Sequence, residues 1–176
     1  MNQENPYAAP TIDPIPPQPD FHPSNLASLG ERFVGAFIDG LVAIGTMLPI
    51  WGAFYLLGFH RSFADIDSNA GWAASAITEL LHFIIYTAVQ WIPLQATGQT
   101  IGKRVANTRI ATMDGGKPPM VDLILKRHAV FWGLALIPKG GSIVSLIDVL
   151  MIFKRDRRCL HDLVAGTQVL SVRNIP

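Results

Sequence analysis

Three charged residues of this sequence lie in or beside long apolar runs, where a charge is unfavourable. Asp39 is the only charged residue in the run 33–58, and Asp148 lies in the run 142–153. Arg32 precedes Asp39 by seven residues, so in a helix the two side chains share a face. A charge at the centre of a membrane helix costs about 2.5 kcal/mol or more on insertion scales unless it has a partner. We therefore expect these residues either to be paired or to do chemistry.

A second polar group follows one side of another apolar run, 73–95. Its members are spaced at i, i+3, i+7 and i+11 and are Glu79, His82, Tyr86 and Gln90. This spacing predicts one stripe along a helix, and the stripe must face protein or water. Glu79 and His82 have the spacing of a di-iron ligand pair, but such sites need a second copy and further carboxylates. We therefore expect no metal site.

The polar residues nearer the basic ends of these runs lie at similar distances along their helices from those ends. This predicts that they form one network. Its expected members are Arg32, Asp39, Tyr86, Gln90, Arg127 and Asp148. If Asp39 and Asp148 approach each other without a cation, repulsion and desolvation favour binding of a proton or Na⁺ there. If each pairs with Arg32 or Arg127 instead, the network mainly fixes helix packing. The sequence leaves both alternatives open.

Two further motifs resemble catalytic sites without meeting their requirements. The run from Gly98 to Arg104 resembles a phosphate-binding loop, but it is one residue short and has Arg104 where a Mg²⁺-binding hydroxyl belongs. His161 and Asp162 form an acid–base pair, but neither a Ser nor a Cys nucleophile occurs in a recognisable context. We expect His161 and Asp162 to make hydrogen bonds in a cytoplasmic motif, and we expect neither enzyme activity nor a cofactor.

Composition places the chain among membrane proteins. Of its 176 residues, 49% are hydrophobic and only 15% are charged, whereas a soluble domain carries about a quarter charged residues. The formal net charge of +1 and the lack of a basic patch with interleaved aromatics argue against nucleic-acid binding. The single cysteine, Cys159, excludes an internal disulfide.

The apolar runs predict an all-α membrane protein, a polytopic helical bundle with a small cytoplasmic β element. Two long transmembrane helices are expected at 33–58 and 73–95, and a shorter helical hairpin at 122–137 and 142–153. A turn around Pro138 separates the shorter pair, which either spans the bilayer or is re-entrant. The stretches 105–112 and 167–172 are β-rich and predict the β element.

Charge and proline content predict orientation and boundaries. The loop 96–128 and the segment 154–173 are rich in Lys and Arg, so both should be cytoplasmic, and both termini with them. Seven of the 13 prolines fall in residues 1–28, which predicts a disordered cytoplasmic tail. The predicted organisation is therefore this tail, a transmembrane domain at 29–172 and a short C-terminal tail at 173–176.

Four blocks of sequence together resemble the RDD family of small membrane proteins. They are Arg32-Phe33 through Ile38-Asp39-Gly40, Gly98 through Arg104, Lys126-Arg127, and Leu160 through Thr167. The family is named for an arginine and two aspartates. Arg32 and Asp39 match the arginine and the first aspartate; the second is Asp148 or Asp162, and we prefer Asp148. The resemblance implies a bacterial inner-membrane location, and cation exchange or solute transport is suggested for some members.

Two functional hypotheses follow. In the first, Asp39 and Asp148 bind or relay a cation and support exchange of H⁺ or Na⁺, or transport of a small solute, and four short helices then require a homo-oligomer to form a pathway. In the second, the protein is a non-transporting scaffold or assembly factor that binds anionic lipid or a protein partner through its basic cytoplasmic loop and tail.

Overall fold

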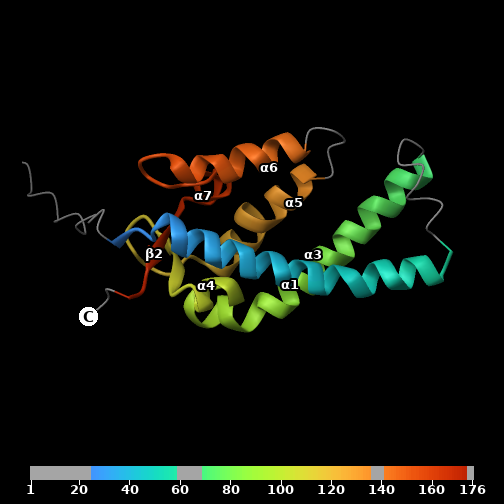
Figure 1. Ribbon diagram of the computed structural model, residues 1–176, viewed down its shortest axis with the longest axis horizontal. Coiled ribbons are helices and arrows are strands. Elements are labelled where there is room, and N and C mark those ends of the chain that lie inside the picture. The colour runs from blue at the N-terminus through green and yellow to red at the C-terminus, as the bar shows by residue number, and fades with distance from the viewer. Residues whose placement is uncertain (1–24, 59–68, 136–140, 174–176) are drawn as a thin grey trace, which may run out of the picture.

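The computed structural model describes residues 25–58, 69–135 and 141–173 and is mainly helical (Figure 1). The described part has this order of elements: α1 Leu29–Leu56, α3 Asn69–Thr97, α4 Ile101–Val105, β1 Thr108–Thr112, η2 Asp122–Ala129, α5 Val130–Ala135, α6 Gly141–Leu150, η3 Met151–Phe153, α7 Leu160–Ala165 and β2 Thr167–Ser171. In Figure 1, α1 passes between α4 on one side and α6 and α7 on the other. This central position of α1 decides which residues can meet.

Helix α1 begins four residues earlier than the predicted span because its start carries a capping box. The Ser28 hydroxyl accepts from the Glu31 N–H at 3.2 Å, and the Glu31 carboxylate accepts from the Ser28 N–H at 2.8 Å. These bonds satisfy donors that the first helical turn leaves free. The helix continues through Pro49 and ends at Leu56, shortly before Gly58 at φ +84°. The capping box therefore brings Arg32 inside the first turn.

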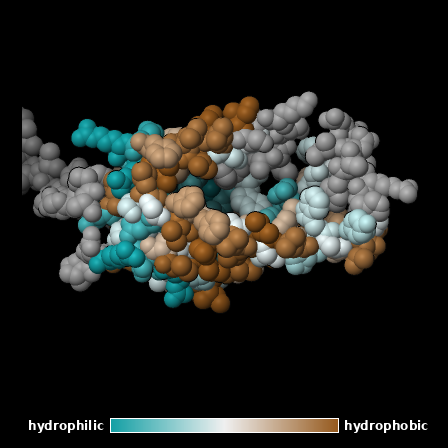
Figure 2. Space-filling view, viewed as in Figure 1, coloured by the Kyte–Doolittle hydropathy of each residue, from teal (hydrophilic) through white to brown (hydrophobic). Residues whose placement is uncertain are grey.

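Helices α1 and α3 are each long and apolar enough to cross a membrane. They contain 28 and 29 residues, so each reaches about 42–44 Å at 1.5 Å per residue. Many of their large apolar side chains are exposed, among them Phe33, Leu48 and Ile92 at 65–76%. Figure 2 shows such apolar side chains gathered along the middle of the molecule. Exposure on this scale suits contact with lipid tails, as the composition predicts. Most of the residues between the two predicted spans, 59–68, lie outside the described part of the chain.

The predicted β element is a two-stranded antiparallel sheet. Strands β1 and β2 pair from Thr108 opposite Ser171 to Thr112 opposite Thr167. A small apolar core joins Ile110 of β1 to Leu94 and Leu123. The chain before α1 also joins it, because Leu26 bridges Leu170 and the Ala27 N–H donates to the Val169 carbonyl at 3.0 Å. Residues 25–28, predicted as part of the disordered tail, are thus held by the free edge of β2; residues 1–24 lie outside the described part.

The predicted third and fourth helices exist, with irregular geometry. The third is a π-helical segment, η2, followed by α5, and the fourth is α6 ending in the short 3-10 turn η3. The turn predicted between them lies almost wholly outside the described residues. Two short helices, α4 and α7, were not predicted, because five or six residues are too few for an apolar period to appear. Both contribute to the functional site, because α7 carries functional side chains and the N-terminus of α4 is capped by one.

Candidate functional site

Asp39 caps the short helix α4 from the middle of α1. Its carboxylate accepts from the Gly102 N–H at 2.8 Å, the Thr100 hydroxyl at 2.5 Å and the Gln90 amide at 3.2 Å. The Lys103 ammonium lies 3.7 Å from it. Burial lowers the pKa of Lys103, and the charge of Asp39 opposes that shift. A helix N-terminus favours negative charge, so the Asp39 carboxylate is matched by both the helix end and a lysine.

Gln90 holds the other side of the same cap. It is completely buried, and its side-chain oxygen accepts from the Ile101 N–H at 2.8 Å while its amide donates to Asp39. Thr100 is the N-cap of α4 and accepts from the Lys103 N–H at 3.2 Å. Asp39 and Gln90, predicted as members of one network, therefore do meet. Thr100 and Lys103 complete that group and were missed, because a five-residue helix gives no periodic signal.

The second cluster centres on Asp162, which is fully buried at the start of α7. Its two oxygens form ion pairs with Arg127 of η2 and with Arg32 of α1, the latter at 3.4 Å. The Thr167 hydroxyl and the Cys159 N–H also donate to it, both at 3.2 Å. Burial alone would raise the pKa of Asp162, but the charges of Arg127 and Arg32 and the hydrogen bond from Arg127 outweigh burial and hold that pKa far below its usual range. Asp162 is therefore ionised and shared by two arginines.

His161 links this cluster to Asp148. Its Nδ1 lies 2.9 Å from the Asp148 carboxylate, which also accepts from the His161 N–H at 3.0 Å. The other ring nitrogen, Nε2, lies 2.9 Å from Arg127 Nη2. Because a guanidinium only donates, Nε2 must accept, which places the ring proton on Nδ1 and leaves the imidazole neutral. Burial and the charge of Arg127 lower the pKa of His161 accordingly.

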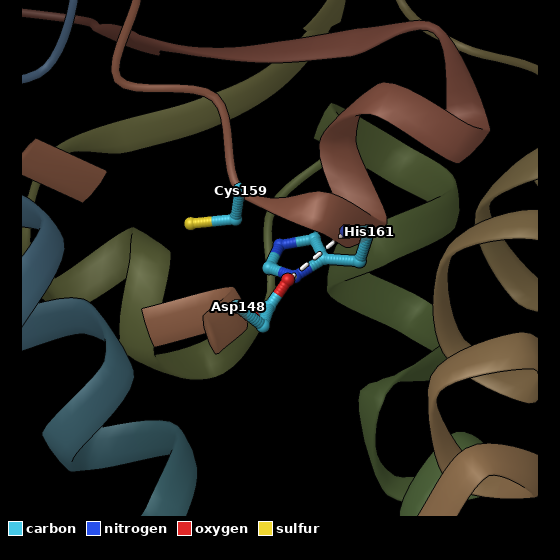
Figure 3. Close-up of side chains that lie close together, drawn as sticks. All are labelled: Asp148, Cys159 and His161. Atoms are coloured by element: carbon cyan, nitrogen blue, oxygen red, sulfur yellow. Dashed lines mark hydrogen bonds and ion pairs between the residues drawn. The ribbon is translucent and has the colours of Figure 1, made fainter. Parts of the chain in front are cut away.

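Asp148, Cys159 and His161 also bring three different donor atoms within 4.8 Å of one another. Figure 3 shows the Asp148 and His161 side chains meeting while the Cys159 sulfur points to one side of them. Both ring nitrogens of His161 are engaged within the protein, and burial raises the pKa of Cys159 to about 11. A metal ion would have to displace Arg127 or Asp148 from the ring and ionise that thiol. This donor set does not fit a resident metal.

The predicted stripe on α3 divides between two neighbours. His82 Nε2 lies 3.0 Å from the Ala43 carbonyl oxygen and 3.1 Å from the Thr46 hydroxyl, both on α1. Tyr86 is buried against the rings of His82, His128 and Trp132. Glu79 is half-buried and lines a cavity of about 200 Å³ beside α5. The stripe thus faces protein, as its spacing predicts.

The six residues predicted as one network therefore lie in four groups. Asp39 meets Gln90, Asp148 meets His161, and Tyr86 lies with the aromatic rings. Arg32 and Arg127 both contact Asp162, whereas the sequence reading offered Asp39 and Asp148 as their partners. The signal for Asp162 was present in the block Leu160 through Thr167. Asp162 lies far from Arg32 in the sequence and outside every apolar run, so the sequence does not indicate that the two residues pair.

A cavity of about 600 Å³ opens beside the second cluster, between α1, α6 and α7. Much of its wall is apolar, and its charged and titratable lining residues are Arg32, Lys103, Arg127, Asp148, Cys159 and His161. This cavity thus touches residues of both clusters.

Comparison with known proteins agrees with this arrangement of blocks. The chain is 34% identical over 84 residues to the uncharacterised protein YckC of Bacillus subtilis (strain 168), a match that covers 44% of this chain and half of the Bacillus protein. It is 24% identical over 152 residues to an uncharacterised protein of Haemophilus influenzae (strain ATCC 51907 / DSM 11121 / KW20 / Rd), covering 85% of this chain and 82% of that protein. No solved structure matches significantly. The model of the RDD family matches residues 26–166, which include Arg32, Asp39, Arg127 and Asp162, and the chain belongs to the RDD family.

Proposed function

We propose that this protein is a multi-pass scaffold of the bacterial inner membrane, without transport or enzyme activity, whose cytoplasmic platform docks on anionic lipid. The platform comprises α4, the two strands, η2 and residues 154–165, which include α7. Asp39 and Asp148, the carboxylates expected to form an ion-binding pair, are each bonded to other groups and not to each other, and this observation carries the proposal. Asp39 is bonded to the N-terminus of α4 and Asp148 to His161. Carboxylates that fasten the platform to the helices account for the buried charges without ion flux.

The topology of this proposal rests on the pairing of three distant segments. Ala27, which precedes α1, bonds to β2, and β2 pairs with β1, which follows α3. Segments that share a sheet lie on the same side of a membrane, so an even number of crossings separates them. The basic residues of these segments favour the cytoplasmic side. Both termini and the platform are then cytoplasmic, with α1 and α3 as one hairpin and η2–α5 with α6 as the other.

Fewer basic side chains are exposed on the platform than the number of basic residues in its sequence suggests. Arg157 donates to the Ala27 carbonyl at 2.9 Å and Arg158 to the Thr167 carbonyl at 3.0 Å, so both hold the platform together. Lys103 is mostly buried beside Asp39. The exposed cations that remain for docking include Arg104, Lys126, Lys154 and Arg155. Each basic side chain near an anionic surface contributes about 1 kcal/mol, and salt screens the attraction.

Hydrogen exchange of the platform in nanodiscs tests docking. Raising the phosphatidylglycerol fraction in phosphatidylcholine discs should slow exchange in α4 and in residues 154–158, and high salt should reverse the effect. The variant R104Q/K126Q/K154Q/R155Q should lose this response. The variant R104K/R155K keeps the charge and should behave as wild type. A hydrogen-exchange rate of the wild-type protein that does not change with lipid composition would refute the docking function.

Proton exchange at Asp148 and His161 is the second candidate function. It is favoured by one observation, that these two directly bonded titratable groups both line the 600 Å³ cavity. A homo-oligomer would then be needed to complete a path across the bilayer. In proteoliposomes with a pH-sensitive dye, we expect no H⁺ or Na⁺ flux. Flux that Asp148→Asn abolishes, and Asp156→Asn does not, would replace the scaffold proposal with this one.

A further inference from the structure

Glu79 is a charged residue of the long apolar helix α3 for which the described chain provides no partner. Its carboxylate makes neither a hydrogen bond nor an ion pair with any described residue, and its side chain is half-buried. The comparable carboxylates Asp39 and Asp148 are bonded to α4 and to His161. A carboxylate in apolar surroundings is unfavourable unless it is paired, so Glu79 requires an explanation. The cavity that it lines supplies one.

The cavity beside Glu79 has an aromatic wall. It has a volume of about 200 Å³ and lies between α3 and α5, and its aromatic lining residues are Phe83 and Trp132. Phe83 follows Glu79 by four residues, which places both side chains on one face of α3. The ring centroids of Phe83 and Trp132 lie 5.7 Å apart, with planes inclined by 65°. Both residues are half-buried, so the carboxylate and the two rings border one accessible space.

This combination of groups suits an organic cation. The faces of aromatic rings carry negative partial charge and attract a cation within about 6 Å of the ring centroid, and tryptophan does so best. The Glu79 carboxylate supplies the formal counter-charge. No Lys or Arg belongs to the described lining, whose remaining members are Ala76, Leu80, Ala129 and Gly133. A ligand with a positive charge and an apolar exterior therefore matches both the carboxylate and the wall.

An inorganic cation matches the same wall poorly. Hard cations such as Ca²⁺ take about six to eight oxygen ligands, and Glu79 offers two oxygens. The indole N–H of Trp132 can only donate, so it cannot coordinate a cation. An alkali ion would give up water molecules that apolar side chains cannot replace. A quaternary ammonium ion is weakly hydrated and has no N–H that needs an acceptor, so it loses little on entry.

We propose that this cavity binds one small quaternary ammonium cation, whose charge pairs with Glu79 while its alkyl groups lie against Phe83 and Trp132. Glu79 is about 15 Å along the axis from the first residue of α3. With α3 across the bilayer, as proposed above, this depth is below the headgroups, which favours a free cation over the headgroup of a lipid. The inference goes beyond docking of the platform and does not use its basic surface.

Binding of radiolabelled choline to the full chain in non-ionic detergent tests the proposal. Equilibrium dialysis should give one saturable site per chain. The uncharged carbon analogue 3,3-dimethylbutan-1-ol, and Na⁺ at the same concentration as choline, should not displace it. Displacement by the alcohol would reduce the site to an apolar hole, and displacement by Na⁺ would make it an inorganic-cation site. Either result, or the absence of saturable binding, overturns the proposal.

Charge variants at position 79 test the role of the carboxylate. Glu79→Gln keeps the size of the side chain and removes the charge, and we expect the affinity for choline to fall about tenfold. Glu79→Asp keeps the charge and should retain most of the affinity. Asp156→Asn, which removes an exposed carboxylate of the segment after α6, is the matched control and should bind as wild type. Equal affinity in Glu79→Gln and Asp156→Asn would refute the assignment.

Aromatic variants test the contribution of the rings. Trp132→Phe should weaken choline binding, and Trp132→Leu should weaken it further, by about three- to tenfold relative to the wild-type protein. Trp91→Leu, which removes an exposed tryptophan outside the cavity lining, should have no effect. An affinity that is the same for Trp132→Leu and Trp91→Leu would contradict a contact between the cation and the ring.

A cavity-filling variant avoids the loss of any packed side chain. Gly133 is exposed and lines the cavity, and a Cβ added there would meet nothing within 4 Å. Gly133→Leu should therefore fold and exclude choline, whereas Gly45→Leu, at an equally open position of α1, should bind it. Full binding in Gly133→Leu would overturn the location of the site.

Nanodiscs separate the two sources of a quaternary ammonium group. The affinity for free choline should be the same in discs of phosphatidylcholine and of phosphatidylglycerol. A weaker apparent affinity in phosphatidylcholine discs would identify the lipid headgroup as a competing occupant and would overturn the assignment to a free cation.

Discussion

Asp39 accepts a 2.8 Å hydrogen bond from the backbone N–H of Gly102, 63 positions further along the chain. The bond requires α1 and α4 to approach closely, and two glycines permit this. A Cβ on Gly102 would lie 2.7 Å from the Asp39 Cγ and would overlap the Gly35 carbonyl oxygen. A Cβ on Gly35 would touch the Ala106 Cβ at 3.4 Å. The match of Gly102 to a phosphate-loop glycine is therefore superficial, because its neighbour is another helix.

Replacement of Gly102 by alanine should destabilise the protein. The added methyl group meets backbone and a bonded carboxylate, so α4 must shift and the Asp39 cap is strained. We expect a loss of about 1–3 kcal/mol in the free energy of unfolding, measured by thermal or chemical denaturation in detergent. Gly45→Ala, on an exposed face of α1 with nothing within 4 Å, is the control and should be neutral or slightly stabilising. Equal stability of the two variants would contradict the close approach.

The loss of Asp162 should cost more than the loss of a surface aspartate. Asp162→Asn leaves Arg32 and Arg127 buried without a counter-charge, which destabilises proteins by about 3–5 kcal/mol. Asp156→Asn removes a carboxylate that lies 3.8 Å from Lys154 and is 38% exposed, and such pairs contribute about 0–1 kcal/mol. Chemical denaturation of both variants in the same detergent measures the difference. A gap below about 1 kcal/mol would show that Asp162 does not neutralise the arginines.

The charges in the apolar runs could be read from sequence, but their partners could not. Composition and apolar period predicted α1, α3 and the shorter helical pair, and β-rich stretches predicted the strands. The contact between Asp39 and Gln90 could also be predicted, because each residue is a polar position on its own long helix. The contact between Arg32 and Asp162 could not be predicted, because it depends on the position of α7 after the sheet has formed. Tertiary pairing of short elements leaves no period in the sequence.

Stability should fall when the solution is acidified through the ordinary pKa of histidine. Burial and the charge of Arg127 lower the pKa of His161, while Asp148 and Asp162 oppose that shift without cancelling it. Near its ordinary value of 6.5 the unfolded chain therefore binds a proton that the folded protein does not. Unfolding takes up that proton, so the contribution of His161 is present above about pH 6.5 and is lost progressively below it.

His161→Gln isolates this effect from other titrations. The glutamine amide keeps hydrogen bonding but cannot bind a proton. The unfolding temperature of the variant should therefore change less between pH 7.5 and about 5.5 than that of the wild-type protein. The histidine variant His82→Gln, on α3, controls for a general effect of losing an imidazole. A pH profile of His161→Gln that follows the wild type over this interval would contradict the neutral, Arg127-bonded imidazole.

Cys159 should resist alkylation until the protein unfolds. It is 8% exposed at the N-cap of α7, and burial, with the charges of Asp162 and Asp148, raises its pKa to about 11. The thiolate is the reactive form, so at pH 8 only about one molecule in a thousand is reactive. Iodoacetamide should modify the native protein slowly and the unfolded chain at the rate of an ordinary thiol. C159S/M113C carries its thiol at an exposed turn position and should react fast in the native state. Native Cys159 reacting as fast as that control would mean that α7 is open to solvent, and the Arg32–Asp162 pair with it.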